Sequence, residues 1–169
     1  MTKTKQTWLV VGIVLLALVL DQVSKVYIKT HFELGEAREV FSWFWIVFVE
    51  NNGMAFGIEW FSKLLLTLFR IVAVGVLGWY IHTMIHKQTV RTGYLVTVAM
   101  VIAGALGNII DCVFYGKIWG DAEWFHGRVV DMLYFPLIRN AAGECLFFRP
   151  VFNIADSFIT VAVFLIILF

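Results

Sequence analysis

The stretch YLVTVAMVIAGALGNIIDCVF, residues 94–114, decides what kind of fold this sequence adopts. It is almost wholly apolar and long enough to cross a bilayer as a helix, because about 20 such residues span the ~30 Å hydrocarbon core. Its last turns nevertheless carry Asn108 and Asp111. Polar groups are costly inside a membrane unless packing or function requires them. We therefore predict a membrane-spanning helix that contributes to a polar site.

Three other stretches also fit a membrane span. The chain of 169 residues is 61% hydrophobic and 15% charged, which lies outside the usual range of soluble domains. The apolar runs are continuous rather than alternating, which excludes a spanning β-barrel. We predict an all-α integral membrane protein in which residues 1–169 form a single membrane domain. The four expected transmembrane helices cover about 8–28, 64–85, 94–114 and 151–169.

The charges predict how these helices are oriented. The net charge is only +1, without a basic tract, so binding of nucleic acid is not expected. Lys3 and Lys5 precede the first span, and no small-x-small cleavage site follows it, so we expect a retained anchor. The short turn 86–93 is also basic, and all twelve acidic residues fall within 21–59 or 111–156. Short basic loops stay in the cytoplasm, so both termini are expected there.

The two long connections, about 29–63 and 115–150, are then expected outside the membrane on the extracytoplasmic side. Residues 40–49 read VFSWFWIVFV, and β-branched and aromatic residues of this kind favour a strand or hairpin. Residues 59–63 are expected to form a short helix at the membrane surface. We therefore predict a small extracytoplasmic β-like cradle and an interfacial helix beside the four spans.

Polar side chains lie at helical spacing on three of the predicted spans, each time at the outer end. They are Asp21 and Lys25 on the first span, Gly104, Asn108 and Asp111 on the third, and Asn153, Asp156, Ser157 and Thr160 on the fourth. Arg70 enters the second span from the same side. A shared polar pocket in the outer leaflet is the simplest explanation.

Plainer explanations stay open for several of these residues. Asp21 and Lys25 can form an ion pair that only fixes packing, and Asn108 can form a hydrogen bond to another helix with the same effect. Small residues at every fourth position, from Ala99 to Gly107, indicate a close helix–helix contact. Cys112 and Cys145 can form a disulfide or remain buried thiols.

Two aspartates suggest acid–base chemistry. Asp131 lies in the apolar run VVDMLY, and Asp156 lies near the start of the fourth predicted span. Two carboxyls close together at a low-dielectric boundary do not both ionise cheaply, so one remains protonated while the other acts as a base. Hydrolysis of an amide by water needs that division. The alternative is two separate structural acids. No HExxH or GxSxG motif indicates another hydrolase.

A rival function is a small proton-coupled transporter or channel. Asp21, Asp111 and Asp156 would then relay protons. Such a relay needs carboxylates along the whole depth of the bilayer, and the inner halves of the predicted spans contain none. The acids therefore favour a site at one depth.

Five motifs, in order along nearly the whole chain, resemble those of the bacterial lipoprotein signal peptidases (signal peptidase II). They are DQVSK at 21–25, NNGMAF at 51–56, GALGNIID at 104–111, RVVD at 128–131 and FNIADS at 152–157.

The resemblance implies an intramembrane aspartic endopeptidase of the bacterial inner membrane. Such an enzyme removes the signal peptide from diacylglyceryl-modified prolipoproteins, cleaving before the lipidated cysteine near the outer, periplasmic face. It implies that Asp131 and Asp156 activate the water as catalytic residues, without a metal or organic cofactor. The implied supporting residues are Asn51, Gly53, Gly104, Asn108, Asp111, Arg128, Asn153, Asp21 and Lys25. We expect a monomer whose partners are lipidated prolipoproteins and membrane lipids.

This sequence departs from the family pattern in two places. Cys112 stands where the family usually has arginine after the aspartate, so the role of that arginine is either vacant or taken by another cation, such as Arg70 or Arg128. The stretch 137–150 is longer than the usual spacing between the two acids, and we expect it to form a lid.

Overall fold

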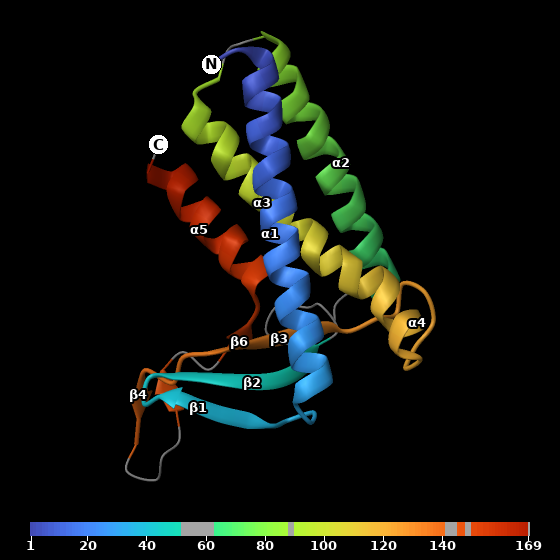
Figure 1. The fold of residues 1–169 in the computed structure, drawn as a ribbon, viewed down its shortest axis with the longest axis vertical. Coiled ribbons are helices and arrows are strands. Elements are labelled where there is room, and N and C mark those ends of the chain that lie inside the picture. Colours follow the sequence, from blue (N-terminus) through green and yellow to red (C-terminus); the bar gives the residue numbers. More distant parts are fainter. Residues whose placement is uncertain (52–62, 88–89, 141–144, 148–149, 169) are drawn as a thin grey trace.

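In the computed structural model, a bundle of helices stands on one side of a small sheet (Figure 1). The structure describes residues 1–51, 63–87, 90–140, 145–147 and 150–168. The bundle consists of α1 (Lys3–His31), α2 (Lys63–Lys87), α3 (Thr92–Ile110) and α5 (Ile154–Leu168). The first turn of α1 and the last turn of α5 lie at the same end of the bundle, opposite the sheet (Figure 1).

Among the described residues, three helical segments are long and apolar enough to cross a membrane: Lys3–His31, Lys63–Lys87 and Thr92–Trp119. They contain the predicted spans 8–28, 64–85 and 94–114 and extend beyond each of them at both ends. Large apolar side chains point away from the bundle along them; on α2, Phe69 and Trp79 are both 69% exposed. Such a surface suits contact with lipid, since hydrocarbon tails are as apolar as these side chains.

The third of these segments is continuous but not uniformly α-helical. After α3 it passes through a π-helical turn (Asp111–Tyr115) into the short α4 (Gly116–Trp119). The carbonyls of Cys112 and Val113 accept hydrogen bonds from the backbone N–H groups of Gly127 and Phe125, at 3.0 and 3.1 Å. The loop after α4 thus folds back onto the turn, and π-helical turns of this kind often accompany functional sites.

The fourth predicted span, about 151–169, is not helical throughout, because Val151 and Phe152 form strand β6. Helix α5 starts at Ile154 and covers 15 residues, or about 22 Å at 1.5 Å per residue. Asn153 ends the strand and caps the helix. Its Oδ1 accepts a hydrogen bond from the backbone N–H of Asp156 at 2.9 Å, and Asp156 Oδ2 accepts one from the N–H of Asn153 at 3.4 Å. This reciprocal capping box sets the first turn of α5.

The expected cradle is a four-stranded antiparallel sheet in the order β1-β2-β3-β6. Its other strands are β1 (Ala37–Phe41), β2 (Phe44–Asn51) and β3 (Val129–Tyr134). The hairpin of β1 and β2 confirms the strand prediction for 40–49. Val49 pairs with Asp131 and Asn51 pairs with Val129, so the end of β2 lies beside the start of β3.

The sheet packs on the C-terminal end of α1. Phe48, Val130 and Met132 belong to one buried cluster with Ile28 and Phe32 of α1. Side chains alternate between the two faces of a strand. The residues next to them in the sequence, Asp131 among them, therefore point to the other face.

Helix α3 lies at the centre of the bundle and packs closely on its neighbours, as the run of small residues predicts. Ala99 and Ala103 are buried. A Cβ on Gly107 would meet the carboxylate of Asp21 and the side chain of Ala155, and one on Gly104 would meet the backbone carbonyl of Ala155. Glycine at these two positions allows α1 and α5 to approach α3.

Three sequence predictions lie wholly or partly outside the described residues. Gly53 is one, and the interfacial helix at 59–63 is another, since only Lys63 is described, as the first residue of α2. Of the long stretch 137–150, the described part contains a two-stranded sheet of β4 (Ile138–Arg139) and β5 (Cys145–Phe147). Its role as a lid stays a prediction.

Candidate active site

Lys25 occupies the centre of a buried polar cluster between α1 and α3. Its Nζ lies 2.9 Å from Asp21 Oδ2 and 2.7 Å from Asp111 Oδ2, and it donates a hydrogen bond to Asn108 Oδ1 at 3.0 Å. The side chain of Lys25 is fully buried. Burying an ion costs several kcal/mol, so the ammonium depends on these partners. The predicted ion pair is confirmed, with Asp111 as a second counter-charge.

The two acids of this cluster also bind backbone amides from distant segments. Asp21 Oδ1 accepts a hydrogen bond from the N–H of Ala155 at 2.9 Å, and Asp111 Oδ2 accepts one from the N–H of Val130 at 3.4 Å. Each of these amides belongs to the residue just before one of the two candidate catalytic aspartates. The cluster therefore holds the start of α5 and the start of β3 against the same part of the bundle.

Two asparagines connect Asp131 on β3 with Asp156 on α5. Asn153 Nδ2 donates to Asp131 Oδ1 at 2.7 Å and to Asn108 Oδ1 at 3.1 Å. Asn108 Nδ2 in turn donates to Asp156 Oδ1 at 2.8 Å. Because Asn108 Oδ1 also accepts from Lys25, the network sets which way this amide faces. Asn108 therefore contacts the candidate catalytic Asp156 in addition to joining α3 to α1 through Lys25.

Asn51 approaches the same pair from the sheet. Its Nδ2 donates to Asp131 Oδ2, so both oxygens of that carboxyl receive a side-chain N–H. Asp156 receives the amide of Asn108 and the backbone N–H of Asn153. Each carboxyl therefore receives two N–H donors; those on Asp131 favour its ionised form, while the charge of Asp156 opposes it.

Asp131 is the more deeply buried of the two acids. It is 2% exposed, whereas Asp156 is half-buried. Burial and the neighbouring charge of Asp156 raise the pKa of Asp131 to about 7, against the opposing effect of the Asn153 and Asn51 hydrogen bonds and of Lys25. A carboxyl with a pKa near neutral pH is suited to general acid–base catalysis.

Sequence analysis missed two residues of the supporting cluster. Gln22 Nε2 donates to Asp21 Oδ2 and to Asp111 Oδ1, both at 3.0 Å, and Tyr115 donates its hydroxyl to Gln22 Oε1 at 3.2 Å. Two signals were available for Gln22: it lies three residues before Lys25, a spacing that puts both on one side of the helix, and it lies inside the DQVSK motif.

A cation from α2 approaches Cys112, the residue that stands where the resembled family usually has arginine. Arg70 Nη1 lies 3.7 Å from Cys112 Sγ, while Arg128 Nη1 lies 3.5 Å from Glu50 Oε2. Arg70 is thus the arginine that comes close to Cys112. No disulfide joins Cys112 to Cys145, and both are thiols.

Most of the predicted site residues lie in one connected network. It contains Asp21, Lys25, Asn51, Asn108, Asp111, Asp131, Asn153 and Asp156. Gly104 contributes a close helix contact, Arg128 lies at the edge beside Glu50, and Gly53 is outside the described residues.

Two carboxyls, one on β3 and one on α5, joined by hydrogen bonds beside a bundle of apolar helices fit an aspartic protease of the membrane, in which two acids activate water. Comparison with known proteins identifies the protein family. The family model of signal peptidase (SPase) II matches residues 13–169, and the chain belongs to this family, whose members are lipoprotein-processing aspartic endopeptidases.

Individual relatives agree with the family assignment. A lipoprotein signal peptidase of Porphyromonas gingivalis is 42% identical over 191 aligned positions, which cover 99% of this chain and 84% of the relative. One from Amoebophilus asiaticus is 36% identical and covers 98% and 78%. A bacterial membrane enzyme solved by the in meso method has a TM-score of 0.73 at 29% identity, over 94% of this chain and 85% of the other.

The chain is therefore an enzyme of the membrane and acts on lipoprotein precursors. The transporter alternative has no support, since the family and the named relatives are peptidases.

Proposed function

We propose that Asp131 and Asp156 are the catalytic pair with which this peptidase removes the signal peptide of diacylglyceryl-modified prolipoproteins. The observation that carries this is the hydrogen-bonded path from Asp131 through Asn153 and Asn108 to Asp156. It joins two acids from different elements, and every amide in it has defined partners. Such preorganisation is what an acid–base pair needs before substrate arrives.

In the proposed mechanism the two acids have different roles. Asp156, which is half-buried, accepts a proton from the attacking water. Asp131, nearly inaccessible and with its raised pKa, retains the proton of the pair and donates it to the carbonyl oxygen or the leaving amine. The scissile bond is the amide just before the lipidated cysteine, held at the depth of the pair by the acyl chains in the outer leaflet.

The remaining predicted residues support this pair. Asn51, Asn108 and Asn153 orient the carboxyls, and the cluster of Asp21, Lys25 and Asp111 holds their backbone. Gly53 and Arg128 are proposed to contribute at the substrate side, and Gly104 through its contact with α5. No metal or organic cofactor takes part in this mechanism.

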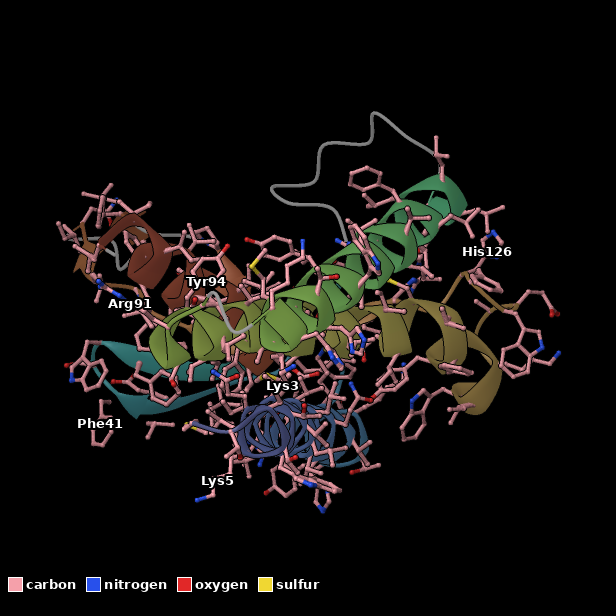
Figure 2. The ribbon with its side chains drawn as sticks, turned by 90° about the horizontal axis from the view of Figure 1, so that it is seen from above. Lys3, Lys5, Phe41, Arg91, Tyr94 and His126 are labelled. Atoms are coloured by element: carbon pink, nitrogen blue, oxygen red, sulfur yellow. The ribbon has the colours of Figure 1, made fainter. Side chains whose placement is uncertain are left out.

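We also propose how the chain sits in the membrane. The single domain crosses the bacterial inner membrane four times as a monomer, with α5 and the strand before it completing the fourth crossing. Lys3 and Lys5 lie in the first turn of α1, and Arg91 directly precedes α3; all three are labelled in Figure 2. A cytoplasmic position of this end of the bundle follows from the positive-inside rule. The catalytic pair then lies near the periplasmic face, on the side of the sheet.

The substrate proposal is tested with purified protein in liposomes. A precursor carrying the diacylglyceryl group is expected to release its leader, while the same precursor without the lipid is expected to be processed at least about a hundredfold more slowly, because positioning by the acyl chains is lost. Gel analysis of leader release measures both rates. Equal processing of the two precursors would contradict a role for the lipid.

The pH dependence tests the assigned roles. Asp131 must keep its proton, and its pKa is raised to about 7, so the rate of cleavage is expected to fall as the pH rises through about 7. Well above this value the loss approaches about tenfold per pH unit. Single-turnover rates from pH 5.5 to 9 measure it. A rate that keeps rising through pH 9 would show that Asp131 is not the acid.

A further inference from the structure

Glu50 lies directly before Asn51 on β2, and its side chain points to the other face of the strand. Its partner in the ladder is Val130, which belongs to the buried cluster against α1. The side chain of Glu50 is only 7% exposed. A nearly buried carboxylate requires a counter-charge, and two cations supply it here.

The first of these cations is Lys29 of α1, and the second is Arg128. Lys29 Nζ donates to Glu50 Oε1 and also lies 3.0 Å from Asp121 Oδ2, while Arg128 reaches Glu50 Oε2 at 3.5 Å. The side chain of Lys29 is 11% exposed, and its Nζ lies over the ring of Trp119, 5.5 Å from the centroid. Glu50 is thus bound to the bundle rather than to solvent.

Lys29 lies one helical turn beyond Lys25 on α1, and this spacing puts both lysines on one face. Lys25 binds the acids that hold the backbone beside Asp131 and Asp156. Lys29 binds the strand that carries Asn51. One face of α1 therefore holds both the backbone beside Asp131 and Asp156 and the strand whose Asn51 contacts Asp131.

We propose that Glu50, held by Lys29, is a positioning residue that keeps Asn51 in contact with Asp131. The proposal rests on the proposed function, since it takes Asp131 as a catalytic acid. The ion pair fixes the end of β2 relative to α1. Without it, this contact between the strand and α1 is lost, and the amide of Asn51 loses its defined distance to the carboxyl of Asp131.

The test combines three variants of the full-length protein in liposomes: Glu50→Gln, Asn51→Ala and the double variant. Glu50→Gln is expected to lower kcat about tenfold with KM little changed, because a misplaced supporting group affects the reacting geometry. Asn51→Ala removes a donor that favours the ionised form of Asp131, so the fall in rate at alkaline pH moves up by about half a pH unit. Glu50→Gln is expected to move it in the same direction.

The double variant decides whether Glu50 acts through Asn51. If it does, the kcat and the pH profile of the double variant match those of Asn51→Ala alone, since residues in one chain of contacts are not additive. Additive losses, or an unshifted pH profile in Glu50→Gln, would overturn the proposal. Lys29→Arg is expected to keep kcat within about twofold because it preserves the charge, whereas Lys29→Met repeats the effect of Glu50→Gln.

Two controls separate this proposal from the proposed function. Glu123→Gln removes an exposed acid, 78% exposed and 3.3 Å from Lys117, and is expected to leave the rate and its pH profile unchanged. Asp131→Asn tests the proposed function itself. If Asp131→Asn remains active, the catalytic pair is wrong; if it is inactive while the Glu50 and Asn51 effects add, only the positioning role is wrong.

Discussion

Asp131→Asn and Asp156→Asn are each expected to abolish processing of a lipidated precursor, with a loss of at least about 10³-fold. General acid–base catalysis by one group contributes roughly 10²–10⁴-fold, and the pair works as a unit, so neither acid substitutes for the other. An amide cannot take up or release the proton that the reaction moves. At position 131 it also places an N–H₂ group among the donors of Asn51 and Asn153. Single-turnover cleavage in liposomes measures the loss.

The control for this experiment is Glu39→Gln, which changes an exposed acid on β1 and is expected to leave cleavage unchanged. Both aspartate variants are expected to insert and to keep the helical content of the wild type, which circular dichroism measures. The double variant is expected to be no less active than either single variant. Cleavage within about tenfold of the wild type in either variant would refute the proposed pair, since an essential acid or base contributes more than that.

Lys25→Met is expected to have the largest effect on stability. It leaves Asp21 and Asp111 facing each other in a buried site without their common cation, and breaking a buried ion pair costs about 3–5 kcal/mol. Activity is expected to fall as well, because the same two acids hold the backbone before both proposed catalytic residues. Unfolding in mixed micelles by denaturant, followed by circular dichroism, measures the free energy.

Two further variants make the Lys25 prediction specific. Lys117→Met changes a lysine that is 51% exposed and is expected to alter the free energy of unfolding by less than about 0.5 kcal/mol. Adding Asp111→Asn to Lys25→Met is expected to restore part of the lost stability, because it removes one uncompensated buried charge. A Lys25→Met protein as stable as the wild type would show that the lysine is not needed to neutralise the two acids.

Local rules predicted the parts of the site that lie on one helix. Helical spacing was enough to pair Asp21 with Lys25, since residues four apart share a face. The hairpin at 40–49 was predicted for a similar reason, because β-branched and aromatic residues favour strands. The end of the third span and the start of the fourth were predicted less well. There the chain makes contacts that a hydropathy pattern does not contain, such as the cap formed by Asn153.

The apolar runs by themselves determined that this chain is a bundle of membrane helices, because a bilayer allows few other ways to satisfy the backbone. The order of its motifs was enough to indicate the family. Only the tertiary structure decided that Asp111 shares the cation of Asp21, that both acids bind backbone amides beside the proposed catalytic pair, and that Glu50 is bound to Lys29. These contacts join residues far apart along the chain, and their geometry depends on how helices and sheet pack against each other.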